Sequence, residues 1–369
     1  MAGIALIFLL SIMIAAFVFL PVFNIVRKIR SAGLAKKISG YRNGIMLKIE
    51  NILSVSETEL KDVLDDFTKD ARNREKGYID TLDDYLLYVL EILEINENRD
   101  RLVAIARMLD FSLDCVNQIK NKDPGISARG ARRAGLYMVI DAAGEMMAAL
   151  NIISSENQFE ILTGLARFGR ADLMQKAFEK ISKNVLLNDR AVTEILSVFP
   201  MGDEKITLFR NMIRTDSDYI SALFLKAISK DMPLALSLSD DIKTVLRERS
   251  KEVRAAAVRG LSALGASLPQ NEIIAALEDH DWEVRAIAAK ALRNAKQPES
   301  SLALYKALYD QQWWVRQNAA NALMTHADFE PLFILAAESG DEYTRDSIIA
   351  ALENGGNPVL LRSIKRMAA

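Results

Sequence analysis

The spacing of apolar and polar residues predicts helices along the whole chain, but the first segment differs from the rest. From Gly3 to Val26 no residue is charged, and the polar exceptions are Ser11 and Asn24. These 24 residues would span about 36 Å as a helix, which exceeds the roughly 30 Å of a hydrocarbon core. The pattern predicts a single transmembrane helix within residues 1–26.

A cleaved signal peptide is the alternative interpretation of this segment. It would need a basic region first and then a shorter apolar run before small residues. No Lys or Arg precedes the apolar run here, and the run is too long. A retained anchor therefore fits the first 26 residues better.

A second pattern begins after residue 55. The stretch "SETE", from Ser56 to Glu59, has the Ser-x-x-Glu spacing of a capping box and predicts a helix start. Apolar residues then follow at helical spacing, and a second helix is predicted over Leu82 to Ile95. We expect residues 56–98 to form an acidic helical segment. It is either a spacer that holds the rest of the chain away from the membrane or the opening of a helical stack.

From about Arg99 the chain falls into predicted helix pairs, and near its end these become a repeat. The stretch "DHDWEVRAIAAKAL", which ends at Leu292, matches "DQQWWVRQNAANAL", which ends at Leu323, at an offset of 31 residues. Related stretches end at Leu261 and Leu352. A helix pair cannot bury its own apolar stripe, so such units must stack on their neighbours. The pattern predicts an α-solenoid over residues 99–369, clearest over residues 250–352.

The details of one unit support this interpretation. Asp281, Ser250 and Asp341 each stand three residues before the Val or Thr that opens the second helix, where they would be N-caps. In "VRAIAAKAL", apolar residues recur at helical spacing from Val284 to Leu292. The alanines among them would let neighbouring helices approach closely.

The pattern Val-Arg-x-x-Ala-x-x-x-Leu, in "VRAAAVRGL", "VRAIAAKAL" and "VRQNAANAL", resembles the short bacterial form of the HEAT repeat. The usual HEAT or armadillo period is longer, about 40–47 residues. The resemblance implies an all-α fold: an α-solenoid of HEAT-like helix pairs, here preceded by a single transmembrane helix. The combination also resembles bacterial membrane HEAT proteins associated with polysaccharide-synthesising glycosyltransferases, although no motif in the sequence specifies such a partner.

Charge adds an orientation to this organisation. Residues 27–50 hold seven cations and one acid, whereas residues 51–100 hold fourteen acids and six bases. Positive charge stays on the cytoplasmic side, so we expect an inner-membrane protein with its N-terminus outside and its repeat domain in the cytoplasm. A periplasmic solenoid would require this rule to fail. The predicted basic juxtamembrane segment is residues 27–55, and its membrane-flanking residues are Arg27, Lys28, Arg30, Lys36 and Lys37.

Four arginines occupy one register of the repeat: Arg254, Arg285, Arg316 and Arg345. In HEAT-like proteins, arginines at such positions tie adjacent units to acids or carbonyls, and we expect that role here. The alternative is a row of guanidiniums that binds an acidic partner.

The three tryptophans lie at the start of repeat helices. Trp282 and Trp313 are equivalent, and Trp314 takes the position of Glu283 and Tyr343. Burial against the next helix is the simpler expectation. The alternative is an aromatic edge that contacts a partner protein, because Trp is enriched where interfaces gain most of their affinity.

The sequence offers little chemistry for catalysis, metals or cofactors, and we predict none of these. His280 and His326 are far apart and have no paired Cys or His, so we expect solvated loop or capping groups. Cys115 is predicted to be a buried small side chain. The basic cluster Ala128 to Arg133 fits a solvated helix face, and a net charge of −2 gives no general field for nucleic acid.

The predicted function is a non-enzymatic scaffold at the membrane, whose concave surface binds another protein, such as a polysaccharide glycosyltransferase or part of a signalling complex. The alternative is an enzyme, because short HEAT units also resemble the phycobilin lyase subunits that attach or remove chromophores. A fold-level likeness supports that alternative only weakly.

Overall fold

A computed structural model describes residues 33, 35–93, 97–150, 155–181, 188–248, 250–295, 297–355 and 357–367 of the 369-residue chain. Within these ranges every regular element is a helix and no strand occurs. The all-α prediction is therefore confirmed for the described part of the chain. The chain divides into two compact units: residues 1–121 with 129–142, and residues 122–128 with 143–369.

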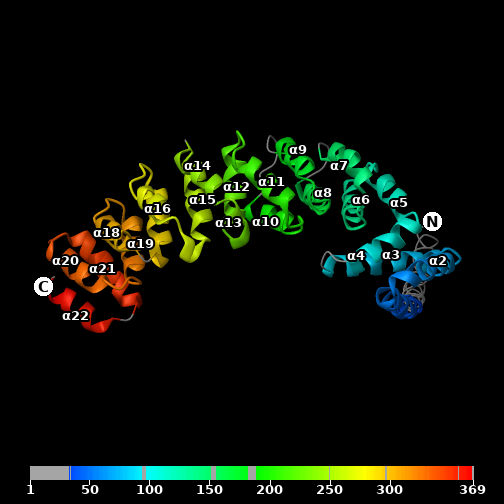
Figure 1. Cartoon of the computed structure of the whole chain (residues 1–369), viewed down its shortest axis with the longest axis horizontal. Coiled ribbons are helices and arrows are strands. Elements are labelled where there is room, and N and C mark those ends of the chain that lie inside the picture. The colour runs from blue at the N-terminus through cyan, green and yellow to red at the C-terminus, as the bar shows by residue number, and fades with distance from the viewer. Residues whose placement is uncertain are drawn as a thin grey trace, which may run out of the picture. The chain divides into compact units, whose positions relative to one another are not determined.

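The first unit is built from helices joined by short turns. A helix over residues 35–54 opens its described part. The elements that follow are α2 (Glu57–Arg72), α3 (Lys76–Ile92), α4 (Glu97–Met108), α5 (Phe111–Ile119), most of α6 (Pro124–Leu136) and the 3-10 turn η1 (Ile140–Ala142) (Figure 1).

The second unit contains helix pairs along the rest of the chain (Figure 1). Its earlier elements are α7 (Ala143–Ala149), α8 (Ser155–Arg167), α9 (Ala171–Ile181), α10 (Asp189–Ser197), α11 (Asp203–Ile213), α12 (Asp218–Ile228), α13 (Met232–Ser237), α14 (Ser239–Thr244) and η2 (Val245–Arg247). Its later elements are α15 (Lys251–Ser262), η3 (Gly265–Ser267), α16 (Gln270–Ala276), α17 (Trp282–Ala291), η4 (Leu292–Asn294), α18 (Pro298–Ala307), α19 (Trp313–Leu323), α20 (Phe329–Glu338), α21 (Glu342–Gly355) and α22 (Pro358–Met367).

The core of the first unit shows that the acidic segment opens a helical stack. Leu64 and Phe67 of α2 and Leu82, Leu86 and Leu90 of α3 are buried, and α2 packs against α3 and α4. A segment with this much buried apolar surface is stabilised by packing and does not stand alone as a spacer. The exact domain boundaries at residues 26, 55 and 98 stay predictions.

A left-handed residue joins α4 to α5. Asp110 has φ 59°, a conformation that Asp tolerates better than most residues. The chain turns there between two short helices. In α6, Gly130 lies against α5, and a Cβ at Gly130 would come within 2.8 Å of the Ile119 backbone nitrogen. This close approach requires glycine.

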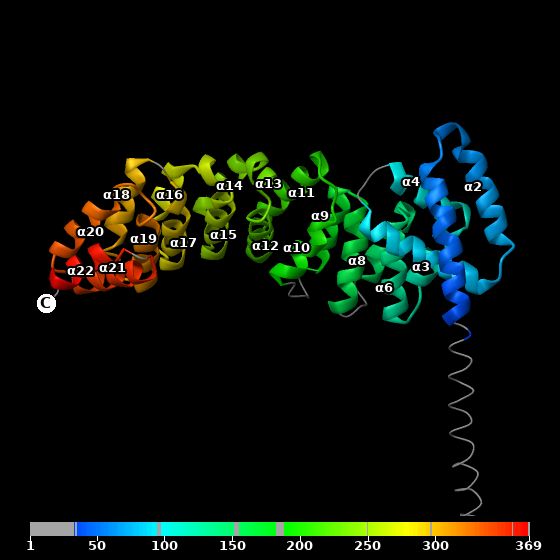
Figure 2. The same ribbon diagram turned by 90° about the horizontal axis from the view of Figure 1, so that it is seen from below.

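The second unit stacks its repeat helices side by side. In Figures 1 and 2, α15, α17, α19 and α21 follow one another as neighbours, and α14, α16, α18 and α20 accompany them as partners. Small residues make this packing possible: Ala256, Ala288 and Ala320 are fully buried, one in each of three successive repeat helices. Farther back along the chain, Phe224 of α12 packs edge-on against Phe178 and Phe209, with ring centroids 5.0 Å apart in both pairs. The solenoid prediction is confirmed at this level.

The predicted N-caps stand at the right positions but bond differently. Ser56, Ser250 and Asp281 are the N-cap residues of α2, α15 and α17, and none of their side chains caps a backbone amide. Ser56 Oγ bonds Glu59 at 2.9 Å, and Asp281 pairs with Arg254. Asp341 alone among the predicted caps accepts a backbone amide, that of Thr344, at 3.3 Å.

The predicted location as a single-pass inner-membrane protein is contradicted. No helix in the described ranges is long and apolar enough to cross a bilayer. The predicted anchor, residues 1–26, lies outside those ranges, as do Arg27, Lys28 and Arg30. The Lys36 and Lys37 side chains are exposed on the first described helix, and Lys37 Nζ pairs with Glu75 at 2.7 Å.

Candidate protein-binding surface

Arg254 ties the unit of α15 to the unit that follows. Its Nε and Nη2 donate to the two carboxylate oxygens of Asp279 at 2.7 and 2.9 Å, and Nη2 also reaches Asp281 at 2.7 Å. Its Nη1 donates to the carbonyl of Glu248 at 2.9 Å. The side chain is 4% exposed, and paired acids are what make so deeply buried a charge tolerable.

Arg285 repeats this arrangement one unit later. Its Nε and Nη2 donate to the two oxygens of Asp310 at 2.7 and 3.0 Å, and its Nη1 donates to the carbonyl of Asp279 at 2.8 Å. Planar guanidinium and carboxylate groups match in such bidentate pairs, which are stronger than neutral hydrogen bonds. Both arginines therefore join neighbouring units, the simpler of the two roles expected from the sequence.

The last two arginines of the row differ. Arg316 Nη1 donates to the carbonyls of Asp310 and Gln311 at 2.8 and 3.1 Å, but within the described residues no carboxylate pairs with its guanidinium. Its guanidinium carbon instead lies 5.4 Å from the ring centre of Tyr343. The Nε atoms of Arg316 and Arg345 are buried without a hydrogen-bond partner among the described residues. The row thus begins with arginines tied to acids and ends with arginines that lack them.

The tryptophans divide into a half-buried residue and an exposed pair. Trp282 is half-buried at the start of α17. Trp313 and Trp314 are 47% and 56% exposed at the start of α19, and their rings meet edge-on with centroids 4.6 Å apart. The simpler expectation, burial against the next helix, therefore fails for this pair. Two adjacent exposed indoles are a large apolar surface on one helix turn.

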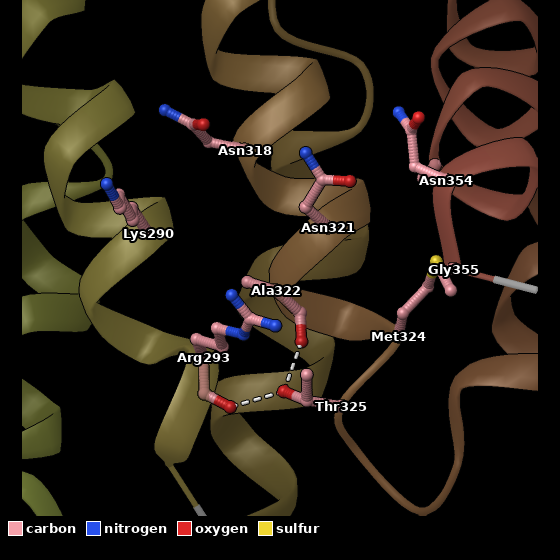
Figure 3. A pocket seen from close by; sticks show the side chains of 10 residues that line it. Lys290, Arg293, Asn318, Asn321, Ala322, Met324, Thr325, Asn354 and Gly355 are labelled. Carbon is pink, nitrogen blue, oxygen red and sulfur yellow. Dashed lines mark hydrogen bonds between the residues drawn. The ribbon is translucent and has the colours of Figure 1, made fainter.

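A groove lies beside α19, the helix that begins with this pair. Trp314, Asn318, Asn321 and Thr325 are spaced by four, three and four residues, so they share one side of the helical path. The last three line a groove of about 510 Å³ together with residues of α17 and α21 (Figure 3). Trp314 and the groove thus share one side of α19.

The walls of the groove are amides and cations. Figure 3 shows Asn318 and Asn321 of α19 between Lys290 on one side and Asn354 of α21 on the other. Asn318 Nδ2 donates to the carbonyl of Ala286 in α17 at 2.9 Å, which fixes that side chain between two helices. The other three side chains are exposed. Asn321 Oδ1 accepts a long hydrogen bond from Gln317 Nε2 at 3.5 Å. Exposed amide and ammonium groups such as these can hydrogen-bond a polypeptide backbone or polar side chains.

The floor of the groove is held by short contacts at the ends of the helices. Thr325 Oγ1 donates to the carbonyl of Ala322 at 2.7 Å and contacts the carbonyl of Arg293 (Figure 3). Gly355 lies against Met324, and a Cβ at Gly355 would come within 1.9 Å of Met324 Cε. The groove is therefore closed at this end by a flexible apolar side chain.

Three residues resemble a hydrolytic triad in type but not in geometry. Ser301 Oγ lies 2.9 Å from His326 Nδ1 and donates to Asp328 at 2.7 Å, and His326 Nε2 lies 2.9 Å from the carbonyl of Leu292. In a triad the imidazole stands between the hydroxyl and the acid. Here the serine stands between them, and the histidine is buried. Of the two roles expected for His326, solvated loop group and capping group, the structure shows the second, because the side chain is buried and its ring meets the Leu292 carbonyl at a helix end.

The other histidine lies in an acidic cluster. His280 is 77% exposed, as predicted, and its ring and the carboxylates of Asp279 and Asp281 lie within 4.8 Å of one another. Both carboxylates already pair with Arg254. Ion pairing to the arginine explains this cluster, and the lack of a metal site stays a prediction.

A buried polar network occupies the first unit. Arg133 donates to Asp83 at 3.0 Å and to Asp114 at 2.7 Å, and the Tyr137 hydroxyl donates to Asp83. Burial and the Asp83 charge raise the pKa of Tyr137 far above its ordinary value, so this phenol stays protonated. The predicted solvated face at residues 128–133 is therefore wrong for Arg133, although Arg129 is exposed.

Cys115 belongs to the same part of the fold. Its side chain is fully buried, as predicted, and burial raises the pKa of the thiol to about 12. The thiolate form needed for nucleophilic attack is therefore scarce near neutral pH.

Comparison with known proteins identifies the repeats. Residues 239–324 and 271–353 match the model of the HEAT repeat family. These spans include α15, α17 and α19 and nearly all of α21, the helices that carry the arginines and tryptophans described above. The HEAT repeats expected over residues 250–352 are therefore confirmed. No curated protein matches the chain.

Solved structures similar to this chain include an engineered protein, at 16% identity over 83% of this chain and 92% of that chain, with a TM-score of 0.33. A designed armadillo repeat protein in complex with the peptide (KR)4 matches at 16% identity over 57% and 98%, with a TM-score of 0.32. The complex of CpcE and CpcF of phycocyanin lyase from Nostoc sp. PCC7120 matches at 15% identity over 69% and 92%, with a TM-score of 0.28. Similarities this low say nothing about what this chain binds.

Sequence reasoning missed the groove because its lining comes from three helices. Asn318, Asn321 and Asn354 stand at ordinary solvent positions of the repeat, where single amides attract no attention. The missing acid beside Arg316 did leave a signal: aligning the units puts Ser339 where Asp279 and Asp310 stand. That difference was visible in the repeat but was not used.

Proposed function

We propose that this protein is a non-enzymatic scaffold that binds another protein on the surface of α17, α19 and α21. The observation that carries the proposal is the exposed Trp313 and Trp314 pair at the start of α19, the helix whose Asn318 and Asn321 line the groove. The first turns of the repeat helices would supply apolar contact, and the groove would supply hydrogen bonds.

Energetics favour this surface over the rest of the described chain. Indole rings contribute much of the affinity of protein interfaces when a partner excludes water from them. Tyr343, in the position equivalent to Trp314, is exposed as well, so the apolar surface extends from α19 to α21. Groups in the groove that are already fixed, such as Asn318, lose little conformational entropy on binding.

In this proposal the first two arginines of the row have a structural role. Arg254 and Arg285 hold successive first turns together and so keep the surface in shape. Trp282 extends the apolar surface towards α17. The candidate partners are a polysaccharide glycosyltransferase and a component of a signalling complex. Identification of the bound protein would decide between them.

Site-specific photo-crosslinking tests the proposal. A photoreactive phenylalanine analogue placed at Trp314 or Asn321 of the full chain should give one discrete adduct with the same protein in cells of the source organism. The matched control is the same analogue at Leu302, which is exposed on α18, away from this surface. The identified protein, once purified, should bind the full chain in a calorimeter and bind Trp314→Ala at least about tenfold more weakly, the effect of losing an interface-centre side chain.

Equal adducts at all three positions, or binding that Trp314→Ala leaves unchanged, would overturn the proposed surface. Attachment or removal of a chromophore by the purified protein would overturn the proposal that it is not an enzyme.

A further inference from the structure

The repeat contains one position where an expected ion pair is missing. Counting five residues back from the Val or Thr that opens the repeat helix gives Asp279, Asp310 and then Ser339. The first two accept the bidentate pairs of Arg254 and Arg285. The third unit is two residues shorter, with a spacing of 29 instead of 31, and it has a hydroxyl where the others have a carboxylate.

Arg316 is the side chain that this difference leaves incomplete. It is 7% exposed, yet only its Nη1 is hydrogen-bonded within the described residues, to the same loop carbonyls that hold its counterparts. Its Nε, which in Arg254 and Arg285 donates to an Asp, is without a partner there. The guanidinium is thus held in place on one side and lacks its carboxylate on the other.

Neighbouring polar groups do not supply the missing acceptor. Ser339 Oγ donates to the carbonyl of Ala336 at 2.7 Å. Asp341 accepts the amide and the hydroxyl of Thr344. The Tyr343 ring also lies near the guanidinium, 5.4 Å from its carbon, and this exposed side chain can turn aside without uncovering a core.

We propose that Arg316 binds a carboxylate of the partner protein, an Asp or Glu side chain presented beside the exposed aromatic residues. This rests on the proposed function, because it assigns a chemistry to the partner that docks on the surface of α17, α19 and α21. The carboxylate takes the bidentate place that Asp279 and Asp310 take in the two preceding units. The same geometry occurs twice within this chain, at Arg254 and Arg285.

The arrangement favours an acidic segment that also carries an apolar side chain. Trp314 and Tyr343 occupy the same position in the first turns of α19 and α21, and both are exposed. An aromatic or aliphatic side chain of the partner lies against them while its neighbouring carboxylate reaches the guanidinium. Ion pairing at a partly desolvated arginine discriminates strongly between an acid and its amide, because only the acid completes the pair.

Peptide selection provides the test. A phage library of random 12-residue peptides is selected on the immobilised full chain, and bound phage are counted on the full chain and on Trp314→Ala. Peptides released by Trp314→Ala are synthesised, and each Asp or Glu is replaced in turn by Asn or Gln. One acid should matter most, and its amide should bind about tenfold or more weakly, as expected for loss of a charge-assisted pair.

Two variants test whether Arg316 causes the preference for that acid over its amide. With Arg316→Gln, the acidic peptide and its amide should bind equally. Ser339→Asp, which restores the acid of the earlier units, should lose the same preference and raise the thermal midpoint of the chain, whereas the matched control Ser339→Asn should do neither. If Arg316→Gln does not fold, the acid preference measured with Ser339→Asp still tests the role of Arg316.

The outcomes separate this inference from the proposed function. Peptides released by Trp314→Ala that show no acid preference, or a preference unchanged in Ser339→Asp, would overturn the role of Arg316 and leave the docking surface standing. Failure to select any peptide that Trp314→Ala releases would overturn both.

Discussion

Replacing Asp279 tests how strongly the arginine row ties one repeat to the next. Arg254 is almost fully buried and pairs with two acids, Asp279 through two hydrogen bonds and Asp281 through one. Removing the last partner of a buried charge costs about 3–5 kcal/mol. Asp279→Asn leaves Asp281 in place, so the expected loss of stability is smaller, about 2 kcal/mol.

The second acid makes the effects of the two replacements non-additive. Asp281 is partly exposed, and its replacement by Asn alone should cost about 0.5–1 kcal/mol, in the range of exposed pairs. The double variant leaves Arg254 with no carboxylate and should cost about 3–5 kcal/mol, more than the sum of the single changes.

The assay is urea unfolding followed by tryptophan fluorescence. All three tryptophans lie in α17 and α19, so the signal reports the repeats next to this pair. The matched control is Asp240→Asn, because Asp240 is 96% exposed and its ion pair is with Lys243, three residues away on the same helix; it should leave the transition unchanged. Strict additivity, or a double variant as stable as the parent chain, would refute the reasoning.

The same pair predicts a dependence on pH. Burial alone would raise the pKa of Asp279. The hydrogen bonds from Arg254 and from the Asp281 amide outweigh this effect and hold the pKa below its ordinary value. An Asp whose pKa is lower in the folded chain than in the unfolded chain stabilises the fold at pH values above the unfolded pKa of about 3.9. This stabilisation is lost as the pH falls through the folded pKa. Asp279→Asn should remove that part of the acid sensitivity.

Other predictions concern single positions. Gly130→Ala should destabilise the first unit by about 1–3 kcal/mol, because its Cβ would meet the backbone of α5, whereas Gly144→Ala, with open space around it, should be neutral or slightly stabilising in the same thermal melt. Cys115 should resist a thiol reagent at pH 8 in the native chain and react once in denaturant, since its thiol is buried with a raised pKa. His326→Leu should lower the midpoint of urea unfolding, because Ser301 and the Leu292 carbonyl lose a buried partner.

The sequence predicted the helices and the repeat well because both depend on local spacing. Apolar residues at helical intervals predicted α2, and the recurring Val-Arg pair predicted α15, α17 and α19. Each repeat helix needs only its neighbours in the sequence for burial, so a one-dimensional pattern carries most of the fold.

Side-chain partners were harder to predict because they depend on geometry between units. Asp281 is a residue type that commonly caps helices, but its carboxylate pairs with Arg254 instead of a backbone amide, because the charged hydrogen bond is stronger. His326 lies in a loop-like stretch, yet the ends of two helices meet around it. Burial was the simpler expectation for Trp313 and Trp314 and was wrong, because sequence cannot show which side of the first turn the next unit covers.

Ser339, in the turn between α20 and α21, shows how one residue changes the use of a repeat. Asp279 and Asp310 hold the arginine of the preceding unit, whereas the serine at the same position leaves Arg316 Nε without a hydrogen-bond partner among the described residues. The helices and the arginine stay where the other units have them. On the proposal made above, a tandem array gains a site of recognition by omitting a single internal ion pair.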